Sequence, residues 1–506
     1  MLKKPQVSNK LRFLIYGLTA VFYFWMAAQI PYTHDDWDWG LDVGLQQLIH
    51  ATVNSRYAGN FFEVIMTRSG LLKTIIMGFG FWYIPLALSR IASRLCSKQS
   101  TSSETVLFLI CNCLLLTMNR EMWRQTYGWV AGYANFGISA LFMLLWINEL
   151  IRCCDPVDGI KKDSSPLLVL IFLASTISQL FLENLAIYHL AAALFICCIH
   201  FYRTKRIPMR NLTMFFGAAF GLIVMFSSSL YDTLFSTGAA VGNYRQIPLL
   251  GGGGLMNALR QIAISAIHLS NRLYSGNFIL CVFVLAVLAV LVHKASLKQG
   301  VKRAFLFGNL LLTVLLFMGF IYDHMAEIHQ TIMFLFDVAL SLGYFLMVLI
   351  ETWVLFQHKK ALKWQLIFLW LSPVIIIAPL VVTTEYGARL FFTTNIYVIL
   401  FDLILMKQAW DGNNGVWPKV LVPTIAFVAS FLFIFHGFIY VQIGECKNTR
   451  DTIIETALLD GASEISLPAY PFREYLQFPD PIDDWRIDYF KEFYGIPLDV
   501  NVTFEN

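Results

Sequence analysis

The sequence predicts an all-α protein that crosses a membrane many times. Of its 506 residues, 57% are hydrophobic and only 14% are charged, and the mean hydropathy is +0.62. A single soluble core cannot bury so much apolar surface. Apolar runs recur along the whole chain, and each is long enough to cross a hydrocarbon layer of about 30 Å as a helix.

We expect about thirteen transmembrane helices. The first is too long for a signal peptide and lacks its small-residue cleavage site, so we expect it to be retained. No Ser/Pro-rich linker separates two soluble domains, and no internal repeat is visible. The expected spans are residues 11–30, 71–90, 104–118, 134–151, 166–182, 185–201, 211–229, 277–293, 304–321, 331–357, 364–382, 389–408 and 418–442.

Lysine and arginine concentrate on alternate loops between these spans, which predicts the orientation of the chain. The basic loops should face the cytoplasm, so the amino terminus should lie inside and the carboxyl terminus outside. We therefore expect a membrane domain over residues 1–442 and a small extracytoplasmic segment over residues 443–506. That segment is acidic and aromatic. We expect it to pack on the outer loops, with stacking on a glycan as the alternative.

The long first outer loop, residues 31–70, opens with three carboxylates set among aromatic side chains. Asp35 and Asp36 precede Trp37, and Asp38 follows it, shortly after the end of the first span. Carboxylates can polarise sugar hydroxyls and aromatic rings can stack on sugars, so we take Asp35 and Asp36 as catalytic candidates. Asp38 and Trp37 are candidate sugar contacts, together with Tyr57 further along the loop. The competing interpretation is an interfacial aromatic belt with solvated acids.

Cations on the expected outer side are almost all arginine. A guanidinium binds phosphate through a planar fork, whereas an ammonium offers only a point charge. A lipid-linked phosphate is therefore the partner that we expect for Arg56, Arg120, Arg124 and Arg389. Ordinary snorkelling and interhelical pairing explain the same residues. Trp123 lies between two of these arginines and is a further candidate sugar contact.

Two other outer turns carry candidate polar residues. Glu183 lies in a tight hairpin with no lysine or arginine nearby in sequence, so we expect it to bind a sugar hydroxyl, to cap a helix or to pair with an outer arginine. One turn contains four side chains that could bind a divalent metal as a cofactor: Asp323, His324, Glu327 and His329. Their spacing matches no standard metal motif, so we favour a solvated turn.

Taken together, these features resemble the GT-C superfamily of membrane glycosyltransferases, which take a sugar from a polyprenyl-phosphate carrier. In that family the catalytic acid lies in the first outer loop, just after the first transmembrane helix, and here His34-Asp35-Asp36-Trp37-Asp38 holds that position. The resemblance implies a GT-C-like fold. It also implies that the outer arginines bind the donor phosphate.

The size, the outer tail and the Asp-Asp pair also resemble the bacterial and phage glucosyltransferases that change O-antigen serotype. This resemblance implies transfer of a single glucose from undecaprenyl phosphate to lipopolysaccharide O-antigen, in the bacterial inner membrane. The expected partners are the lipid-linked donor, a surface glycan and membrane lipids, with no nucleic acid. The alternatives are a transporter or flippase for lipid-linked sugars, an O-antigen polymerase or ligase, and a non-catalytic membrane scaffold.

Overall fold

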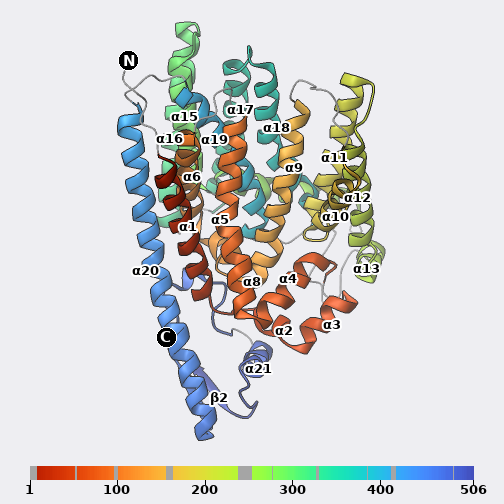
Figure 1. The fold of residues 1–506 in the computed structure, drawn as a ribbon, viewed down its shortest axis with the longest axis vertical. Helices are drawn as coiled ribbons and strands as arrows, with labels where there is room; N and C mark the ends of the chain where they lie inside the picture. Colours follow the sequence, from red (N-terminus) through yellow and green to blue (C-terminus); the bar gives the residue numbers. More distant parts are fainter. Residues whose placement is uncertain are drawn as a thin grey trace.

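The computed structural model describes residues 8–51, 54–95, 101–154, 163–237, 254–275, 277–325, 330–383, 386–411, 417–481 and 484–505. Ten helical segments in these ranges are long and apolar enough to cross a membrane, which confirms a polytopic all-α membrane protein. Figure 1 shows most of them running along the long axis of the molecule. They are built from α1 (Asn9–Gln29), α5 (Gly70–Arg94), α8 (Val130–Gly132) with η1 (Tyr133–Gly137) and α9 (Ile138–Cys154), α11 (Glu183–Thr204), α12 (Met209–Phe226), α16 (Gln299–Met325), α17 (Gln330–Leu355), α18 (Lys360–Ile377) with η3 (Ala378–Val382), η4 (Ala388–Phe391) with α19 (Phe392–Asp411), and α20 (Trp417–Asp460).

Each of the three other expected spans corresponds to a shorter helix. The first, α6 (Thr101–Leu116), bends by 95° into α7 (Arg120–Thr126), so the pair forms a broken span. The other two are α10 (Ser165–Ser178) and α15 (Phe278–Lys294), with 14 and 17 residues. The expected count of thirteen exceeds the ten long apolar helices, or eleven if the bent pair is one span. In α10 the helix ends at Ser178, whereas the expected span continues through the turn to Leu182.

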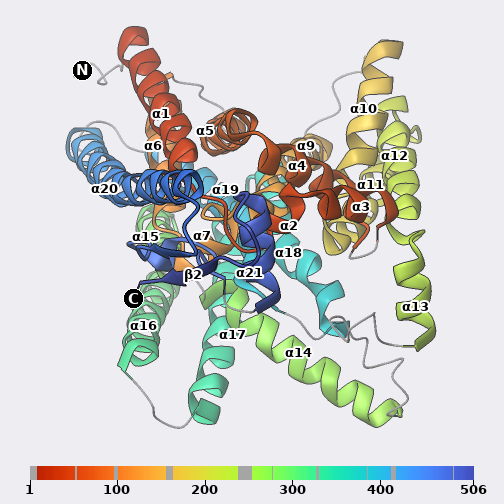
Figure 2. The ribbon, with the colours of Figure 1, turned by 90° about the horizontal axis from the view of Figure 1, so that it is seen from below.

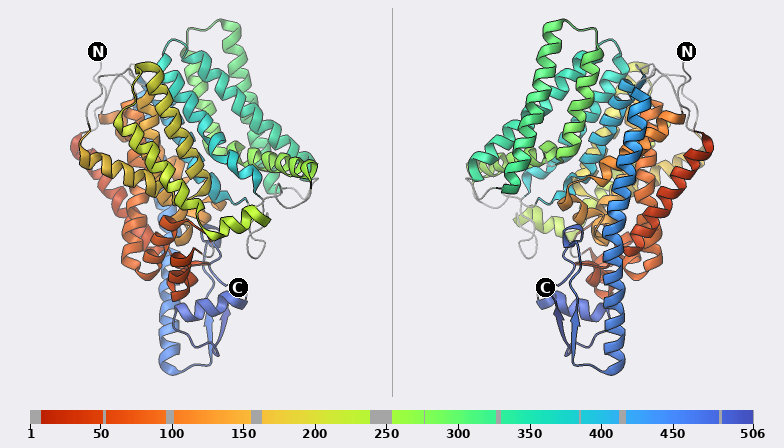
Figure 3. Two further views of the ribbon diagram at one scale, coloured as in Figure 1. Left: turned by 90° about the vertical axis from the view of Figure 1, so that its right-hand side faces the viewer. Right: turned by 90° about the vertical axis from the view of Figure 1, so that its left-hand side faces the viewer.

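The remaining helices lie near one end of the bundle or across it. Residues 31–70, the loop that we expect on the outer side, form α2 (Asp36–Gly40), α3 (Asp42–His50) and α4 (Tyr57–Arg68), at the lower end of the bundle in Figure 1. Further along the chain come α13 (Ser229–Thr237) and α14 (Leu255–Ser275), and α14 lies across the direction of the spans (Figure 2, Figure 3). The short helices α3 and α4 thus pack beside the acidic motif of α2.

The longest helix, α20, carries the carboxyl-terminal segment away from the bundle. Its 44 residues make it about 66 Å long, roughly twice the thickness of a hydrocarbon layer. It therefore runs without a break through position 442, where the sequence places the end of the membrane domain. At its far end β1 (Glu464–Leu467) pairs in parallel with β2 (Asn501–Phe504), near α21 (Asp484–Phe493), as Figure 1 and Figure 3 show. The short helix η5 (Arg473–Tyr475) lies nearer the bundle, where Tyr475 meets His436 of α20 with ring centroids 6.0 Å apart.

The carboxyl-terminal segment packs on the first outer loop. Trp37 of α2 meets Phe490 of α21 edge to face, with ring centroids 5.3 Å apart. Phe493 meets Tyr32 in the same way at 5.3 Å, and it lies against Gly40 so closely that a Cβ there would clash with its ring. Trp37 is thus part of a small apolar core that joins the two segments.

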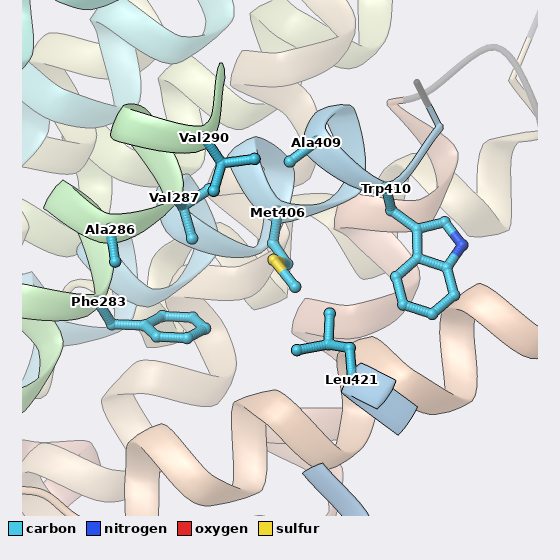
Figure 4. A pocket seen from close by; sticks show the side chains of 8 residues that line it. All are labelled: Phe283, Ala286, Val287, Val290, Met406, Ala409, Trp410 and Leu421. Atoms are coloured by element: carbon cyan, nitrogen blue, oxygen red, sulfur yellow. The ribbon is translucent and has the colours of Figure 1, made fainter. Parts of the chain in front are cut away.

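An apolar cavity of about 210 Å³ lies between α15, α19 and α20. Figure 4 shows that its walls are Phe283, Ala286, Val287, Val290, Met406, Ala409, Trp410 and Leu421. Residues 406–410 end α19 whereas Arg389 lies just before its start, so the cavity is about 30 Å from that arginine. It contains none of the candidate site residues.

Candidate functional site

The acidic motif starts in a tight turn that ends in α2. His34 has a φ of +55°, a left-handed conformation that a non-glycine residue adopts at some cost, and Asp35 is the N-cap of α2. The backbone N–H of Asp36 donates to the carbonyl of Thr33 at 3.0 Å. This turn sets Asp35 and Asp36 on different sides of the chain.

Asp36 is fully buried and binds two backbone N–H groups. Thr33 donates to Oδ2 and Ala131 donates to Oδ1, both at 2.8 Å. Burial raises the pKa of Asp36 to about 8, against the two backbone hydrogen bonds, and the charge of Asp35 raises it further. Asp36 therefore ties the acidic turn to the start of α8, and its carboxylate has no face open to a substrate.

Asp35 is the accessible member of the pair. Its side chain is 36% exposed, and its Oδ1 lies 2.5 Å from Nδ1 of His34. A guanidinium nitrogen of Arg486, from α21 in the carboxyl-terminal segment, lies 3.9 Å from the same oxygen. Asp35 thus has an imidazole beside it and a cation near it.

Asp38 is the third carboxylate of the motif, and it is mostly buried. Burial, and then the charge of Asp35, raise the pKa of Asp38 to about 7, against hydrogen bonds from its own backbone, Trp39 and Gln47. Its neighbour Trp37 is 1% exposed and packs in the core described above. In this conformation Trp37 presents no ring face on which a sugar could stack.

Two of the arginines reach the acidic turn through aromatic rings on either side of His34. Phe478 stacks on His34 with centroids 5.1 Å apart, and the guanidinium of Arg124 lies 5.7 Å from the Phe478 ring. Trp129 meets His34 edge to face at 5.3 Å, and the guanidinium of Arg389 lies 5.6 Å from the Trp129 ring. The structure therefore places Arg124 and Arg389, which lie far apart in sequence, each one aromatic ring away from the imidazole beside Asp35.

Arg56 and Glu183, to which the sequence assigns different ligands, bind one another. A guanidinium nitrogen of Arg56 lies 2.9 Å from a carboxylate oxygen of Glu183, and Tyr231 donates to the other oxygen at 2.9 Å. The guanidiniums of Arg56 and Arg389 both lie about 6 Å from the ring of Phe136. Glu183 thus pairs with an arginine, which is one of the three roles expected for it, and this pair lies near Arg389.

Arg120 and Trp123 lie away from the acidic turn. Arg120 is 67% exposed and lies 3.9 Å from Glu474 of the carboxyl-terminal segment. Trp123 is 1% exposed, and its indole N–H donates to the hydroxyl of Tyr440 at 2.8 Å. Trp123 therefore packs α7 on α20. Tyr57 is half-buried at the first position of α4.

Glu63 is a site residue that sequence reasoning missed. It lies on a buried polar face of α4 with Asn60 and Thr67, each at most 3% exposed, and its carboxylate accepts a hydrogen bond from Nδ2 of Asn135 at 3.2 Å. The signal was present, because residues 60, 63 and 67 recur at helical spacing in an otherwise apolar stretch. Burial and the charges of the three aspartates raise the pKa of Glu63 well above its ordinary value.

Among the described residues no three His, Cys, Asp or Glu side chains are grouped to hold a metal ion. Of the turn that left a metal open, Glu327 and His329 lie outside the described residues. Asp323 and His324 belong to the last turns of α16, where the structure describes the backbone alone.

Comparison with known proteins adds no family, because no protein-family model, curated protein or solved structure matches this chain.

Proposed function

We propose that this protein is a membrane glycosyltransferase, which moves one sugar from a polyprenyl-phosphate donor to a surface glycan. The observation that carries the proposal is an accessible carboxylate, Asp35, beside His34, with Arg124 and Arg389 each one aromatic ring away from that imidazole. A base for an acceptor hydroxyl and cations for a leaving phosphate are the two parts that such a transfer needs.

Asp35 is the base in this mechanism, because it alone of the Asp35–Asp36 pair is open to solvent. It takes the proton of the acceptor hydroxyl as that oxygen forms a bond to the anomeric carbon of the donor sugar. The bond from the same carbon to the phosphate oxygen breaks, and the lipid phosphate leaves with that electron pair. General-base help of this kind is worth about 10²- to 10⁴-fold in rate.

Arg124 and Arg389 stabilise the negative charge that grows on the departing phosphate. Each guanidinium is held against an aromatic ring, so its position is set before the donor binds. Arg56 lies near the same place, but its partner Glu183 already neutralises it. In this proposal the donor phosphate binds Arg124 and Arg389, and Arg56 contributes less because it is paired with Glu183.

The site lies at the end of the bundle that carries the first outer loop and the carboxyl-terminal segment. We place this end at the periplasmic face of a bacterial inner membrane, with the amino terminus in the cytoplasm, on the basis of the basic loops at the other end. Glucose as the sugar and O-antigen as the acceptor rest on the resemblance to serotype-converting enzymes. The GT-C architecture rests on the same resemblance.

The test is sugar transfer by the purified protein in lipid nanodiscs, with radiolabelled polyprenyl-phosphate glucose and O-antigen. The wild type should label the acceptor and Asp35→Asn should not. The matched control is Asp499→Asn, which changes an exposed aspartate of the carboxyl-terminal segment. Equal transfer by the wild type and Asp35→Asn would overturn the proposal, and activity only with a pyrophosphate-linked oligosaccharide would point to a polymerase or ligase.

Asp402 favours a second candidate function, the transport of a lipid-linked sugar. It is fully buried in α19, and neither carboxylate oxygen has a hydrogen-bond partner among the described residues. Ionisable residues inside a membrane commonly mark transport pathways. A flipping assay separates the two functions: a transporter loses flipping in Asp402→Asn and keeps it in Asp35→Asn.

A further inference from the structure

Glu63 and Asp36 both bind the short segment of residues 129–137, Glu63 through the side chain of Asn135 and Asp36 through the backbone of Ala131. Nδ2 of Asn135 donates to Glu63 at 3.2 Å and to the carbonyl of Ala131 at 3.1 Å. The backbone N–H of Ala131 in turn donates to Asp36 at 2.8 Å. An unbroken chain of hydrogen bonds thus runs from Glu63 through Asn135 and Ala131 to the acidic turn.

The segment that this chain holds contacts two of the arginines, Arg389 and Arg56. Trp129 begins it and contacts both His34 and Arg389, and Phe136 lies near Arg389 and Arg56. Residues 133–137 form a π-helix, a widened turn that is frequent at functional sites. A shift of this segment would therefore move the cations relative to Asp35.

Close packing leaves the segment little freedom. A Cβ at Gly59 of α4 would lie 2.1 Å from Oδ1 of Asn135, so only glycine lets Asn135 approach Glu63. Glu63 itself is 2% exposed. The contact is thus buried and tightly packed, and a change of charge on Glu63 is poorly screened by bulk solvent.

We propose that Glu63 is a positioning residue that works as a neutral carboxylic acid, and that its ionisation loosens the Asn135–Ala131 contact and lowers activity at alkaline pH. This proposal rests on the proposed function. It assigns a pH-sensitive element to the same site.

The charges around Glu63 favour its neutral form. Asp35, Asp36 and Asp38 act on it from the acidic turn and α2, and burial penalises its anion most. Its one hydrogen bond from Asn135 opposes them but is outweighed. The other titratable or charged groups on α4 and the elements packed against it are Asp42 and His50 of α3, Lys73, Tyr83, Arg90 and Arg94 of α5, Tyr133 of η1, and Arg56, Tyr57 and Arg68 at the ends of α4 itself.

The experiment compares Glu63→Gln with the wild type over a pH series. Glutamine keeps an oxygen for Asn135 but cannot ionise, so the alkaline fall in kcat/KM should shift upward by about one pH unit or more. Glu63→Ala removes the acceptor and should lower kcat/KM about tenfold or more across the whole series. The control is Glu464→Gln, an exposed glutamate that also accepts from an asparagine amide, Asn501, and it should keep the wild-type profile.

A second measurement does not depend on transfer. Because the folded protein holds a proton on Glu63 that the unfolded chain releases, its stability should fall as pH rises, and Glu63→Gln should fall less. Identical pH profiles and identical melting curves for Glu63→Gln and the wild type would overturn the inference. If no form of the protein transfers sugar, the proposed function fails, and the melting curves still decide the role of Glu63.

Discussion

The backbone N–H of Ala131 donates to Oδ1 of Asp36 across 95 residues of sequence, at 2.8 Å. The bond joins the first outer loop to the start of α8. It explains why two adjacent aspartates differ. The carboxylate of Asp36 is buried and bonded to the backbone, whereas the carboxylate of Asp35 is partly exposed and lies beside His34. The predictions below follow from this division.

Asp35→Asn should lower sugar transfer by about 10² or more while the protein stays folded, because the carboxylate is a base and is partly exposed. Asparagine keeps the shape of the side chain and cannot accept the proton. Transfer assays beside melting curves and size-exclusion profiles check both parts. Asp35→Glu, which keeps the carboxylate, should recover part of the rate. Unchanged transfer in Asp35→Asn would remove Asp35 from the mechanism.

Asp36→Asn should destabilise the protein, in contrast to Asp35→Asn. An asparagine amide has one oxygen, so its NH₂ group must face the N–H of either Thr33 or Ala131, at a cost of about 1–3 kcal/mol. A lower melting temperature and lower abundance in the membrane should accompany any loss of transfer. A stable but inactive Asp36→Asn protein would instead make Asp36 the catalytic base.

Stability should decrease as pH rises from about 4 to about 8. The folded state holds a proton on Asp36, with its pKa raised to about 8 from an ordinary 3.8, that the unfolded chain has already lost. The unfolded state thus binds fewer protons, and the stabilisation that is complete below the unfolded pKa is lost as pH rises through the folded one. Melting curves of the detergent-solubilised protein check this, and Asp36→Asn should show a flatter dependence than Asp499→Asn. A wild-type melting temperature that rises over this range would contradict it.

Arg389→Ala and Arg124→Ala should each raise the KM for the lipid-linked donor about tenfold or more, since each removes a charged hydrogen-bond donor for the phosphate. Arg120→Ala should change the same KM little, because Arg120 is exposed and lies beside Glu474. Donor titrations at a fixed acceptor concentration measure all three. Equal effects of the three substitutions would mean that the arginines act through long-range charge alone.

Arg450→Met should loosen the carboxyl-terminal segment and reduce transfer. Arg450 and Asp480 are both almost fully buried and lie 2.7 Å apart, and breaking such a pair costs about 3–5 kcal/mol, although Arg473 remains near Asp480 at 3.0 Å. Phe478 lies two residues before Asp480 and contacts His34, so the loss should reach the site. Limited proteolysis of the segment and transfer assays report on the two effects. Protection equal to that of the wild type would show that the pair is dispensable.

The sequence predicted the membrane fold well because hydrophobic length is a local property. A run such as 389–408 is apolar whatever surrounds it, and it forms most of α19. An apolar run that ends in a turn, such as 166–182, predicts a helix that extends beyond the observed end of α10 at Ser178, because hydrophobicity does not distinguish a turn residue from a helical one. The acidic motif and the outer arginines also stood out, since charge and aromatic residues at the ends of spans are visible without a partner.

Which of these residues meet was decided by tertiary structure alone. Nothing local distinguishes Asp35 from Asp36, because the difference lies in the burial of Asp36 and in its hydrogen bond from Ala131. Likewise, Arg56 pairs with Glu183, Trp123 donates to Tyr440, and Trp37 packs on Phe490. Arg124 lies against Phe478 and Arg389 lies against Trp129, and both of these rings contact His34. The sequence by itself determined a helical membrane protein with an acidic motif at the edge of its first span. Contacts between distant segments decided which carboxylate is open and which cations lie in its neighbourhood, because burial and pairing exist only once the helices have packed.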